Sequence, residues 1–310
     1  MEEWELVVIG AGPAGLTAGL YGVRSGLRTL IIEEKIPGGT AADSPLIENY
    51  PGFPSISGQE LMAKMAEHCQ KFGVPIKQFE KVIGLDLAGE KKRIKTEKGG
   101  YEASAVIIAT GCSLRELGVP GESEFRGRGV SYCPVCDGAF FRGKNVLVVG
   151  GGNSAAVSAI YLANIAGGVK LAHRRERLRA EEAYVKDLLK RNVEILWNTE
   201  VREIKGDNVV RSVVLFNNKT GETSELKIDG VFIQAGEIPN SQLAKAAGVK
   251  VDDHGYIVVD SRQRTNIPGV YAAGDVTATP VKQVGVAVGQ AIIATIDAFG
   301  HIKRPYHYQG

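Results

Sequence analysis

The residues best suited to chemistry in this chain are two thiols and a carboxylate in the run Ser131–Gly138, which reads SYCPVCDG. Cys133 and Cys136 are close enough in sequence to form a disulfide within one short loop. If a helix follows Cys133, its free N–H groups favour the thiolate and lower the pKa of the thiol. Asp137 follows the second cysteine and could exchange a proton as the disulfide opens and closes. The run therefore indicates a redox-active pair.

A zinc site is the alternative use of such a pair. Structural zinc takes about four nitrogen or sulfur ligands. The remaining cysteines, Cys69 and Cys112, stand alone and are far from each other in sequence. We interpret Cys69 as a buried apolar residue and Cys112 as structural. Redox use is therefore favoured over metal binding.

Length and composition indicate a globular protein of two domains. The chain has 310 residues, of which 44% are hydrophobic. A net charge of +2 with interspersed signs argues against a nucleic-acid partner. The acidic start Met1–Trp4 does not fit a signal peptide, and four cysteines do not make a secreted disulfide framework. Because no uninterrupted apolar run is as long as a membrane span, we expect a cytoplasmic protein that does not contact membranes.

The N-terminal residues have the pattern of a dinucleotide-binding βαβ unit. A buried strand over 6–9 leads into Gly10-Ala11-Gly12-Pro13-Ala14-Gly15, followed by a helix over about 16–25 and a strand over 28–32. That strand ends in Glu33-Glu34. The turn and the helix N-terminus would hold a pyrophosphate, and Glu33 would accept hydrogen bonds from ribose hydroxyls. A plain turn with a solvated Glu33 accounts less well for this agreement.

A second copy of the pattern begins at Val146. A strand over 146–149 leads into Gly150-Gly151-Gly152-Asn153-Ser154-Ala155, and a helix runs to about Ile165. The next strand, 169–172, ends not in an acid but in the basic run His173–Arg179. Arginines at this place accommodate a 2′-phosphate, whereas an acid would hold a free ribose hydroxyl. The second turn is therefore predicted to bind NADP(H); the alternative for the basic run is a solvated face.

The remaining periodicities complete two α/β units. Further helices are expected over 59–72, 180–191 and 283–299. A meander of short strands is expected over 76–103, with buried strands over 105–111, 230–236, 255–259 and 269–275.

Two dinucleotide folds with a Cys-x-x-Cys at the start of the second resemble the low-molecular-weight thioredoxin reductases over nearly the whole chain. The matching pieces occur in the order of that family and close to its spacings. They are Gly10–Gly15, Ala109-Thr110-Gly111, Cys133–Asp137, Gly150–Ala155, His173-Arg174-Arg175 with Arg179, and Gly274-Asp275.

The resemblance implies an α/β fold of two Rossmann-like dinucleotide-binding domains of the three-layer ββα type. FAD would bind the first and NADPH the second, with the NADPH domain inserted into the FAD domain. The expected boundaries are 1–114 and 242–310 for the FAD domain and 115–241 for the NADPH domain. Two flavin-domain signatures, Ala109–Gly111 and Gly274-Asp275, bracket the second glycine turn and support this nesting.

The resemblance also assigns residues to each site. Cys133, Cys136 and Asp137 would be catalytic. The expected FAD-binding residues are Gly10, Gly12, Pro13, Ala14, Gly15, Glu33, Glu34, Gly38, Gly39, Thr40, Asn49, Val82, Ala109, Thr110, Gly111, Gly274, Asp275, Lys282, Gln283 and Val284. The expected NADPH-binding residues are Gly152, Asn153, Ser154, Ala155, His173, Arg174, Arg175 and Arg179. Asn49 would lie near the isoalloxazine, Asp275 near the ribityl chain and Gln283 near the pyrimidine end of the flavin.

The implied activity is reduction of thioredoxin, or of a glutaredoxin-like protein disulfide, by a homodimeric enzyme. NADPH would reduce the flavin, which would open the disulfide through Cys136, and Cys133 would then attack the substrate disulfide. Because the pair belongs to the NADPH domain, we expect rotation about the connections near 114–120 and 236–242.

Three departures from the family pattern bear on affinity and potential rather than on reaction class. Thr40 stands where many relatives have glutamine, Lys282 replaces an arginine, and Ala156-Val157-Ser158 replaces acidic residues. A flavin-dependent dithiol oxidase and a reductase driven by ferredoxin or another carrier are the enzyme alternatives. The arginines after 172 argue against both. A flavin-bearing redox sensor or a zinc-stabilised binding protein is the non-enzyme alternative.

Overall fold

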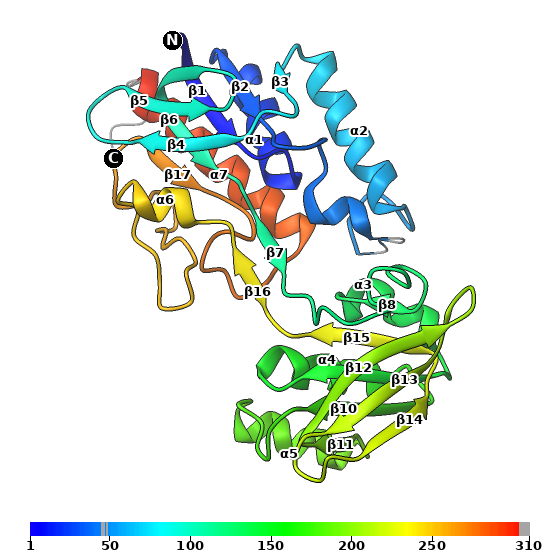
Figure 1. The fold of residues 1–310 in the computed structure, drawn as a ribbon. Helices are drawn as coiled ribbons and strands as arrows, with labels where there is room; N and C mark the ends of the chain where they lie inside the picture. Colours follow the sequence, from blue (N-terminus) through cyan, green and yellow to red (C-terminus); the bar gives the residue numbers. More distant parts are fainter. Residues whose placement is uncertain (45–46, 48, 304–310) are drawn as a thin grey trace. The chain divides into compact units, whose positions relative to one another are not determined.

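The structure, a computed structural model, describes residues 1–44, 47 and 49–303. The chain divides into two compact units (Figure 1). Unit 1 consists of Met1–Ser113 and the chain from Ile238 onward, and unit 2 is the continuous segment Leu114–Glu237. The two chain crossings, β7 (Cys112–Leu114) and β16 (Glu237–Pro239), pair with each other as a two-stranded ribbon.

Unit 1 is built on a seven-stranded sheet among the described residues. Its strands are β1 (Glu2–Ile9), β2 (Thr29–Ile32), β3 (Ile76–Lys77), β4 (Val82–Asp86), β5 (Lys92–Thr96), β6 (Gly100–Ile108) and β17 (Val270–Ala272). The parallel part has the order β3-β2-β1-β6, and β17 pairs with the end of β6. The first half of β6 pairs instead with β5, in an antiparallel meander with β4.

The two faces of this sheet bury different elements (Figure 1). Leu6 and Val8 face α1 (Pro13–Arg24), α2 (Gly58–Lys71) and α7 (Val284–Lys303), whereas Val7 and Ile9 face the meander and α6 (Gln242–Ala246). This alternation is the period of a strand buried on both sides. It produces the three layers of a ββα unit.

Small residues let α1 lie unusually close to the sheet. A Cβ added to Gly19 would come within 2.4 Å of the Ile31 side chain, and one on Gly22 within 2.5 Å of Thr29 Oγ1. These glycines are three residues apart and share one helix face. On α7, a row of buried alanines serves the same purpose against α1: Ala287, Ala291, Ala294 and Ala298.

Unit 2 repeats the plan with a five-stranded parallel sheet in the order β11-β10-β9-β15-β8. Its strands are β8 (Val130–Ser131), β9 (Asn145–Gly150), β10 (Gly168–His173), β11 (Glu194–Trp197) and β15 (Gly230–Gln234). The helices α4 (Asn153–Ala163) and α5 (Glu182–Lys190) cover one face. The antiparallel strands β12 (Thr199–Gly206), β13 (Val210–Asn217) and β14 (Thr223–Lys227) cover the other.

The predicted fold class, two Rossmann-type α/β units, is confirmed. Two element predictions need correction. The last strand of the expected meander and the strand at 105–111 are one strand, β6, which pairs with β1 along its length and with β5 and then β17 on its other edge. Residues 255–259 form isolated bridges at Ile257 rather than a strand.

Among the described residues, one helix, α7, passes a test of length and composition for a membrane span. Gln290 and Asp297 interrupt it, so the expectation that no uninterrupted apolar run is as long as a span is not contradicted. One such helix is weak evidence, because a core helix passes the same test. Its buried alanine row packs in the core of unit 1.

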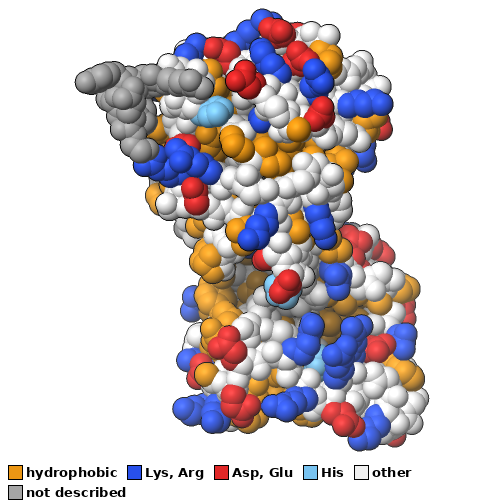
Figure 2. Space-filling model, turned by 90° about the vertical axis from the view of Figure 1, so that its left-hand side faces the viewer, with side chains coloured by type: hydrophobic (Ala, Val, Ile, Leu, Met, Phe, Trp, Pro, Cys, Tyr) orange, Lys and Arg blue, Asp and Glu red, His pale blue; other side chains and the backbone are white. Residues whose placement is uncertain are grey.

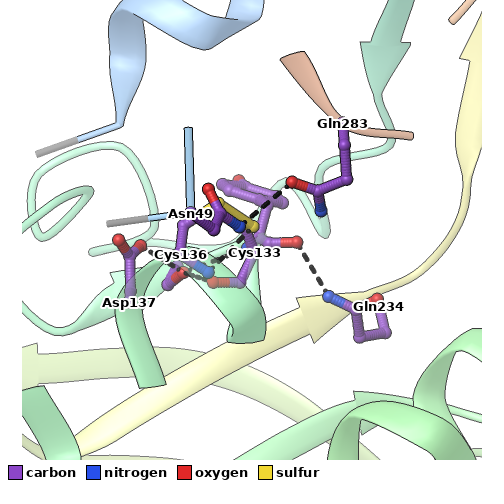
Figure 3. The surroundings of a disulfide bond; sticks show 8 residues. Asn49, Cys133, Cys136, Asp137, Gln234 and Gln283 are labelled. Carbon is purple, nitrogen blue, oxygen red and sulfur yellow. Dashed lines mark hydrogen bonds between the residues drawn. A yellow bond between two sulfur atoms is a disulfide. The ribbon is translucent and has the colours of Figure 1, made fainter. Parts of the chain in front are cut away.

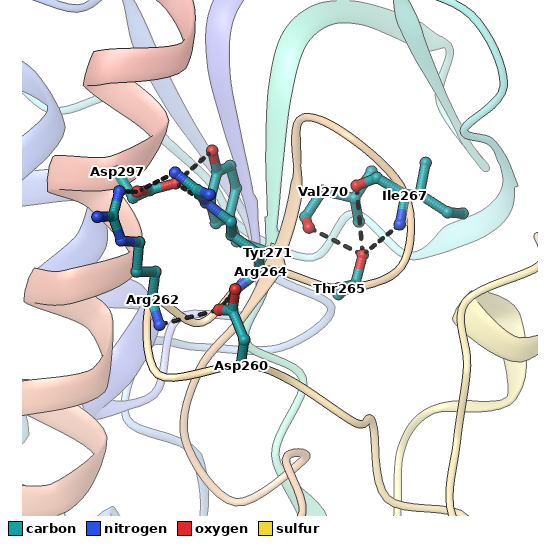
Figure 4. Close-up of polar contacts among 8 residues, drawn as sticks. All are labelled: Asp260, Arg262, Arg264, Thr265, Ile267, Val270, Tyr271 and Asp297. Carbon is teal, nitrogen blue, oxygen red and sulfur yellow. Dashed lines mark hydrogen bonds and ion pairs between the residues drawn. The ribbon is translucent and has the colours of Figure 1, made fainter. Parts of the chain in front are cut away.

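Polar contacts tie α7 to β17 and to the chain that precedes it. Asp297 on α7 accepts two hydrogen bonds from Arg264, at 2.6 and 2.7 Å, and one from the Tyr271 hydroxyl at 3.1 Å (Figure 4). Arg262 lies 3.6 Å from the same carboxylate.

On the face drawn in Figure 2, basic and acidic side chains are interspersed, in agreement with the small net charge.

Candidate functional site

The two cysteines lie in unit 2, where β8 gives way to the one-turn helix α3 (Pro134–Asp137). Cys133 is the N-cap of α3, and Pro134 follows with a fixed φ that suits the first helical position. The sulfurs of Cys133 and Cys136 form a disulfide, with Cα atoms 5.3 Å apart (Figure 3). The Cys136 N–H donates to Cys133 Sγ at 3.2 Å. A hydrogen bond of this kind favours a thiolate on Cys133 once the disulfide opens.

Asp137 is buried beside the pair, with 8% of its surface exposed. Its Oδ2 accepts a hydrogen bond from Ser131 Oγ at 2.6 Å, and its buried Oδ1 has no partner among the described residues. Burial raises the pKa of Asp137, and the Ser131 hydrogen bond opposes this only in part. The carboxyl group is therefore held in an environment that favours its protonated form.

Ser131 was missed as a functional residue. Its hydroxyl donates to Asp137 and accepts the Cys133 N–H at 3.1 Å, so it connects the carboxylate with the first cysteine. A hydroxyl residue two positions before a cysteine is a sequence signal for such a local side-chain-to-backbone hydrogen bond.

The first glycine turn joins β1 to α1 and admits almost no side chains. Gly10 has a φ of +102°, and a Cβ there would lie 2.4 Å from the Ala109 carbonyl oxygen. A Cβ on Gly15 would lie 1.8 Å from the Gly10 carbonyl oxygen. Gly12 is open, with Gly39 Cα as its nearest neighbour, 3.9 Å from a built Cβ. Gly12 is the N-cap of α1 and gives no side-chain cap, so the first N–H groups are left for another acceptor.

Distant parts of unit 1 meet at this turn. The Gly38 N–H donates to the Ala11 carbonyl at 2.8 Å, and 3-10 helix η1 (Gly39–Asp43), which contains the exposed Thr40, begins beside Gly12. A Cβ on Gly274 would lie 3.0 Å from Ala14 Cβ. The predicted residues 10–15, 38–39, 109 and 274 are therefore brought together.

The two acidic residues after β2 behave differently. Glu33 turns back to the glycine turn, and its carboxylate accepts the Ala11 N–H at 2.7 Å and the Lys35 N–H at 2.8 Å. Glu34 is exposed and pairs with Lys81 at 2.7 Å. The structure therefore places Glu33 at the turn and directs Glu34 to Lys81.

Hydrogen bonds connect the Thr110-Gly111 turn to Asn240, which was not among the predicted site residues. Thr110 Oγ1 donates to the Asn240 carbonyl at 2.7 Å, and Asn240 Nδ2 donates to the Thr110 carbonyl at 2.9 Å. Gly111 supplies the positive φ of +62°. These bonds join residues 130 positions apart, so no local pattern could reveal them.

Asp275 and Lys282 form the other side of the predicted flavin site. Burial raises the pKa of Asp275, and the charge of Lys282 opposes that rise. Lys282 Nζ donates to the backbone carbonyls of Asp275 and Thr277, at 2.6 and 2.8 Å, and lies over the Tyr256 ring. In the same unit, Asn49 Nδ2 donates to Gln283 Oε1 at 3.2 Å (Figure 3).

Two predicted flavin residues contribute apolar surface. Val82 is buried at the start of β4, and Val284 is half-buried at the start of α7. The structure gives them no polar role, since valine side chains carry no hydrogen-bonding group.

The second glycine turn encloses His173. A Cβ on Gly151 would lie 2.1 Å from the His173 ring, whereas one on Gly152 would meet no atom within 4 Å. His173 is 6% exposed, and its two ring nitrogens face the carbonyl oxygens of Gly150 and Arg177, at 2.9 and 3.0 Å. Burial lowers the pKa of His173, and the charges of Arg175 and Arg179 lower it further. The buried imidazole therefore connects the glycine turn, at Gly150, with the basic run, at Arg177.

The arginines of this run are outside and free. Arg174, Arg175 and Arg179 are exposed, and no ion pair to them occurs within the part of the chain that the structure describes. Glu176, the one acid among them, pairs with Lys219 instead. The Arg179 N–H donates to the Gly151 carbonyl at 2.7 Å, which brings the run back to the turn.

The start of α4 completes this side. Ala155 is fully buried and Ser154 is exposed. Asn153 exchanges two hydrogen bonds with Glu181, both 2.9 Å. Gly152, like Gly12, is an N-cap without a side-chain cap.

Comparison with known proteins identifies the family of this chain. The family described as pyridine nucleotide-disulphide oxidoreductase matches residues 4–291. The chain belongs to this family. It is 45% identical, over 94% of its length and 92% of the relative's, to the thioredoxin reductase of Bacillus subtilis. It is 41% identical, over 97% of its length and 98% of the relative's, to a 34.2 kDa protein in the rubredoxin operon of Clostridium pasteurianum.

Among solved structures, the thioredoxin reductase of Streptococcus pyogenes superimposes with a TM-score of 0.92 at 42% identity. That match covers 98% of this chain and 99% of the solved chain. Family membership, the two glycine turns and the disulfide are therefore mutually consistent.

Proposed function

We propose that this chain is a thioredoxin-disulfide reductase that transfers electrons from NADPH through FAD and the Cys133–Cys136 pair to a protein disulfide. The observation that carries the proposal is the Cys133–Cys136 disulfide beside a buried Asp137, in a chain with two glycine turns. The names of the relatives support thioredoxin as the substrate.

The residues of unit 1 fit FAD. The bare turn at Gly12 and the uncapped start of α1 suit a pyrophosphate, and Glu33 lies at that turn to accept ribose hydroxyls. We propose that the remaining predicted FAD residues, from 38 to 284, hold the rest of the cofactor. Glu34 is the weakest member of the set, because Lys81 already takes its carboxylate.

The residues of unit 2 fit NADPH. Gly152 is open at the uncapped start of α4, and three exposed guanidinium groups stand free nearby in sequence for a 2′-phosphate. His173 fits a supporting role better than direct contact, since both its ring nitrogens face backbone carbonyls. We therefore assign unit 1 to the FAD domain and unit 2 to the NADPH domain, with exchange between two domain orientations about the crossings.

The chain's own groups account for the thiol chemistry. When bound, NADPH supplies hydride and FAD relays its two electrons to the disulfide. Breaking the S–S bond with two electrons and two protons gives two thiols, and protonated Asp137 is placed to supply one proton. Cys133, whose thiolate the Cys136 N–H favours, attacks the partner disulfide, and Cys136 resolves the mixed disulfide.

Substrate range, assembly and compartment are part of the proposal. Thioredoxin is the favoured partner because relatives are named for it. A glutaredoxin-like protein is the second candidate, because the chemistry of Cys133 suits either disulfide. We propose a homodimer and a cytoplasmic location from the family resemblance, and the buried reduced thiol of Cys69 fits a reducing compartment.

Anaerobic titration of the FAD-loaded protein tests this function. NADPH should bleach the flavin absorbance and expose two new thiols. Oxidised thioredoxin should then reoxidise the thiols and the flavin. Cys136→Ser should keep the flavin and its reduction by NADPH while losing turnover of thioredoxin. Indifference of the flavin to NADPH would contradict the proposal and favour a dithiol oxidase or a carrier-driven reductase.

A further inference from the structure

Tyr132, the residue just before the redox pair, is held by side chains from several parts of unit 2. Its hydroxyl donates to Glu122 Oε1 at 2.7 Å. Its carbonyl accepts a hydrogen bond from Gln234 Nε2 at 2.9 Å (Figure 3). The guanidinium of Arg126 lies over its ring, 5.0 Å from the ring centre. Burial, followed by the hydrogen bond to Glu122, raises the pKa of Tyr132, so the phenol remains a donor at neutral pH.

Glu122 connects Tyr132 with the chain that enters unit 2. Only 3% of Glu122 is exposed, and its carboxylate accepts the N–H groups of Leu117 at 2.9 Å and Gly118 at 2.7 Å. The Val119 N–H lies 3.4 Å from Glu122 Oε2. One carboxylate therefore ties the loop Leu117–Val119, three residues after β7, to the residue that precedes Cys133.

The second crossing is joined to the same point. Gln234 ends β15 and is followed within three residues by β16. The Arg115 N–H donates to the Gly236 carbonyl at 3.0 Å, so the two connections hold each other where they reach unit 2. Tyr132 is thus bonded to the loop after one crossing through its hydroxyl and to the strand before the other through its carbonyl.

We propose that Tyr132 is a positioning residue that couples the redox state of Cys133–Cys136 to the loop Leu117–Val119 through Glu122. The hydrogen-bonded arrangement described above accompanies the intact disulfide. Opening the disulfide frees the backbone at Cys133, so the Tyr132–Glu122 bond is weaker in the dithiol form. The inference rests on the proposed function only in treating the pair as redox-active.

Thermodynamic linkage makes this coupling measurable from either end. If reduction loosens the bond to Glu122, then removing the bond must favour reduction by the same factor. A hydrogen bond to a buried carboxylate is worth enough to shift the equilibrium roughly tenfold. Tyr132→Phe keeps the ring and removes only the donor, which makes it the direct test.

The first experiment equilibrates the FAD-loaded protein with glutathione buffers and counts alkylated thiols by mass after acid quenching. Two glutathione thiols supply the two electrons and two protons, and leave as one glutathione disulfide. In Tyr132→Phe we expect Cys133–Cys136 to become half-reduced at a roughly tenfold lower ratio than in the parent. The ratio is the squared concentration of glutathione divided by that of glutathione disulfide. Tyr184→Phe, on α5, is the matched control and should behave as the parent protein. Neither thioredoxin nor NADPH enters this measurement.

The second experiment measures hydrogen exchange at the amides of residues 117–119 in the oxidised and glutathione-reduced protein. Reduction should accelerate exchange in the parent and leave it unchanged in Tyr132→Phe, where the loop is already released. If the bond is purely structural, its removal in Tyr132→Phe should accelerate exchange equally in both redox states. That result would overturn the coupling.

Glu122→Gln and the double variant complete the test. If the two residues act through one bond, their effects on the glutathione equilibrium are strongly non-additive. Additive effects, or an equilibrium within twofold of the parent in both single variants, would overturn the coupling alone. If Tyr132→Phe does not fold, Glu122→Gln, which keeps an acceptor oxygen but removes the charge that strengthens the bond, carries the same prediction with a smaller shift. A pair that neither glutathione nor NADPH through FAD can open would overturn the coupling and the proposed function together.

Discussion

Asp137 shows how residue-scale surroundings decide what a carboxyl group can do. Burial raises the pKa of Asp137 above that of an aspartate in water, and Oδ1 has no partner among the described residues that would stabilise the ionised form. The hydrogen bond from Ser131 limits the rise in pKa. Asp137, with its hydrogen bond from Ser131, is therefore suited to donate a proton to the neighbouring disulfide.

We predict that Asp137→Asn stabilises the fold at high pH while it slows turnover. Because the folded pKa lies above the unfolded value of about 3.9, the wild-type stability falls as pH rises from there through the folded pKa. Asparagine does not ionise, so the difference in melting temperature should be near zero at pH 4 and should favour the variant increasingly above it. Turnover should fall roughly 10²-fold or more, as expected when an acid catalyst is lost.

Ser131→Ala is the companion measurement. It removes the hydrogen bond that lowers the pKa of Asp137, so the alkaline limb of the pH–rate profile should move to higher pH. A limb that stays in place would mean that Asp137 does not supply the proton.

The free arginines support a second residue-scale prediction. Replacing Arg174 and Arg175 by alanine should weaken NADPH by roughly 10–100-fold and NADH by less than about threefold, since only NADPH carries a 2′-phosphate. Arg202→Ala is the control, because that exposed arginine already pairs with Glu200. Equal losses for both nucleotides, measured by flavin reduction at varied concentration, would contradict the phosphate assignment.

At this scale the sequence predicted the chemistry-bearing residues but not their partners. The cysteines, Asp137 and both glycine turns follow from spacing alone. The links from Asn240 to Thr110 and from Lys282 to the carbonyls of Asp275 and Thr277 do not. Asn240 is 130 positions from its partner, and any of several carbonyls could have accepted from a lysine.

At the scale of elements, the glycines of the second turn do two separate jobs. Gly151 is bare because the His173 ring occupies the space of its Cβ, whereas Gly152 is open in the free protein. Gly151→Ala should therefore lower thermal stability, by roughly 1–3 kcal/mol for a clash in a packed interior. Gly152→Ala should leave stability nearly unchanged and weaken NADPH, whose phosphates approach the open backbone.

Thermal unfolding and nucleotide titration of the two variants side by side check this division. Matching losses of stability in both would show that the second turn is a purely structural feature. A fully stable Gly151→Ala protein would show that His173 can move aside at no cost.

The connection of α7 to the segment before β17 gives an element-scale prediction with a pH sign. Burial alone would raise the pKa of Asp297, but hydrogen bonds from Arg264 and Tyr271 outweigh it and lower the pKa. The stabilisation is therefore present above the unfolded pKa of about 3.9 and is lost as pH falls through the folded pKa. Asp297→Asn should cost about 1–3 kcal/mol at pH 7.

Chemical unfolding at pH 7 and again near pH 3 provides the test. The difference between Asp297→Asn and the parent should shrink at the lower pH, because the stabilisation is lost as pH falls below the unfolded pKa toward the folded one. Asp253→Asn, an exposed aspartate of the same unit, is the control and should change little at either pH. A deficit that is the same at both values would assign the effect to packing rather than charge.

Element types were largely predictable because the strands in the parallel parts of both sheets read as continuous apolar runs. The errors occur where tertiary pairing decides. Residues 255–259 have strand-like composition but find only bridge partners at Ile257, and β6 is one strand because β1 pairs with it along its length. A local pattern carries no information about such partners.

The topology of the whole molecule makes the two units unequal. Unit 2 is one continuous segment, and its two core clusters draw on residues 117–235 alone. Unit 1 depends on both of its segments, because β17 pairs with β6 and α7 packs against α1. Closing unit 1 thus requires chain from both sides of unit 2.

We therefore predict that residues 114–237 fold when produced alone, whereas residues 1–113 do not. The isolated unit 2 should show a cooperative thermal transition and bind NADPH in preference to NADH, without any flavin. Residues 1–113 lack the strand and the helix that cover their core, so their buried faces would meet water. Circular dichroism, with nucleotide titration followed by tryptophan fluorescence at Trp197, checks both fragments. A folded, FAD-binding 1–113 fragment would show that the C-terminal segment is dispensable, and would contradict the assignment of a flavin domain split between the two ends of the chain.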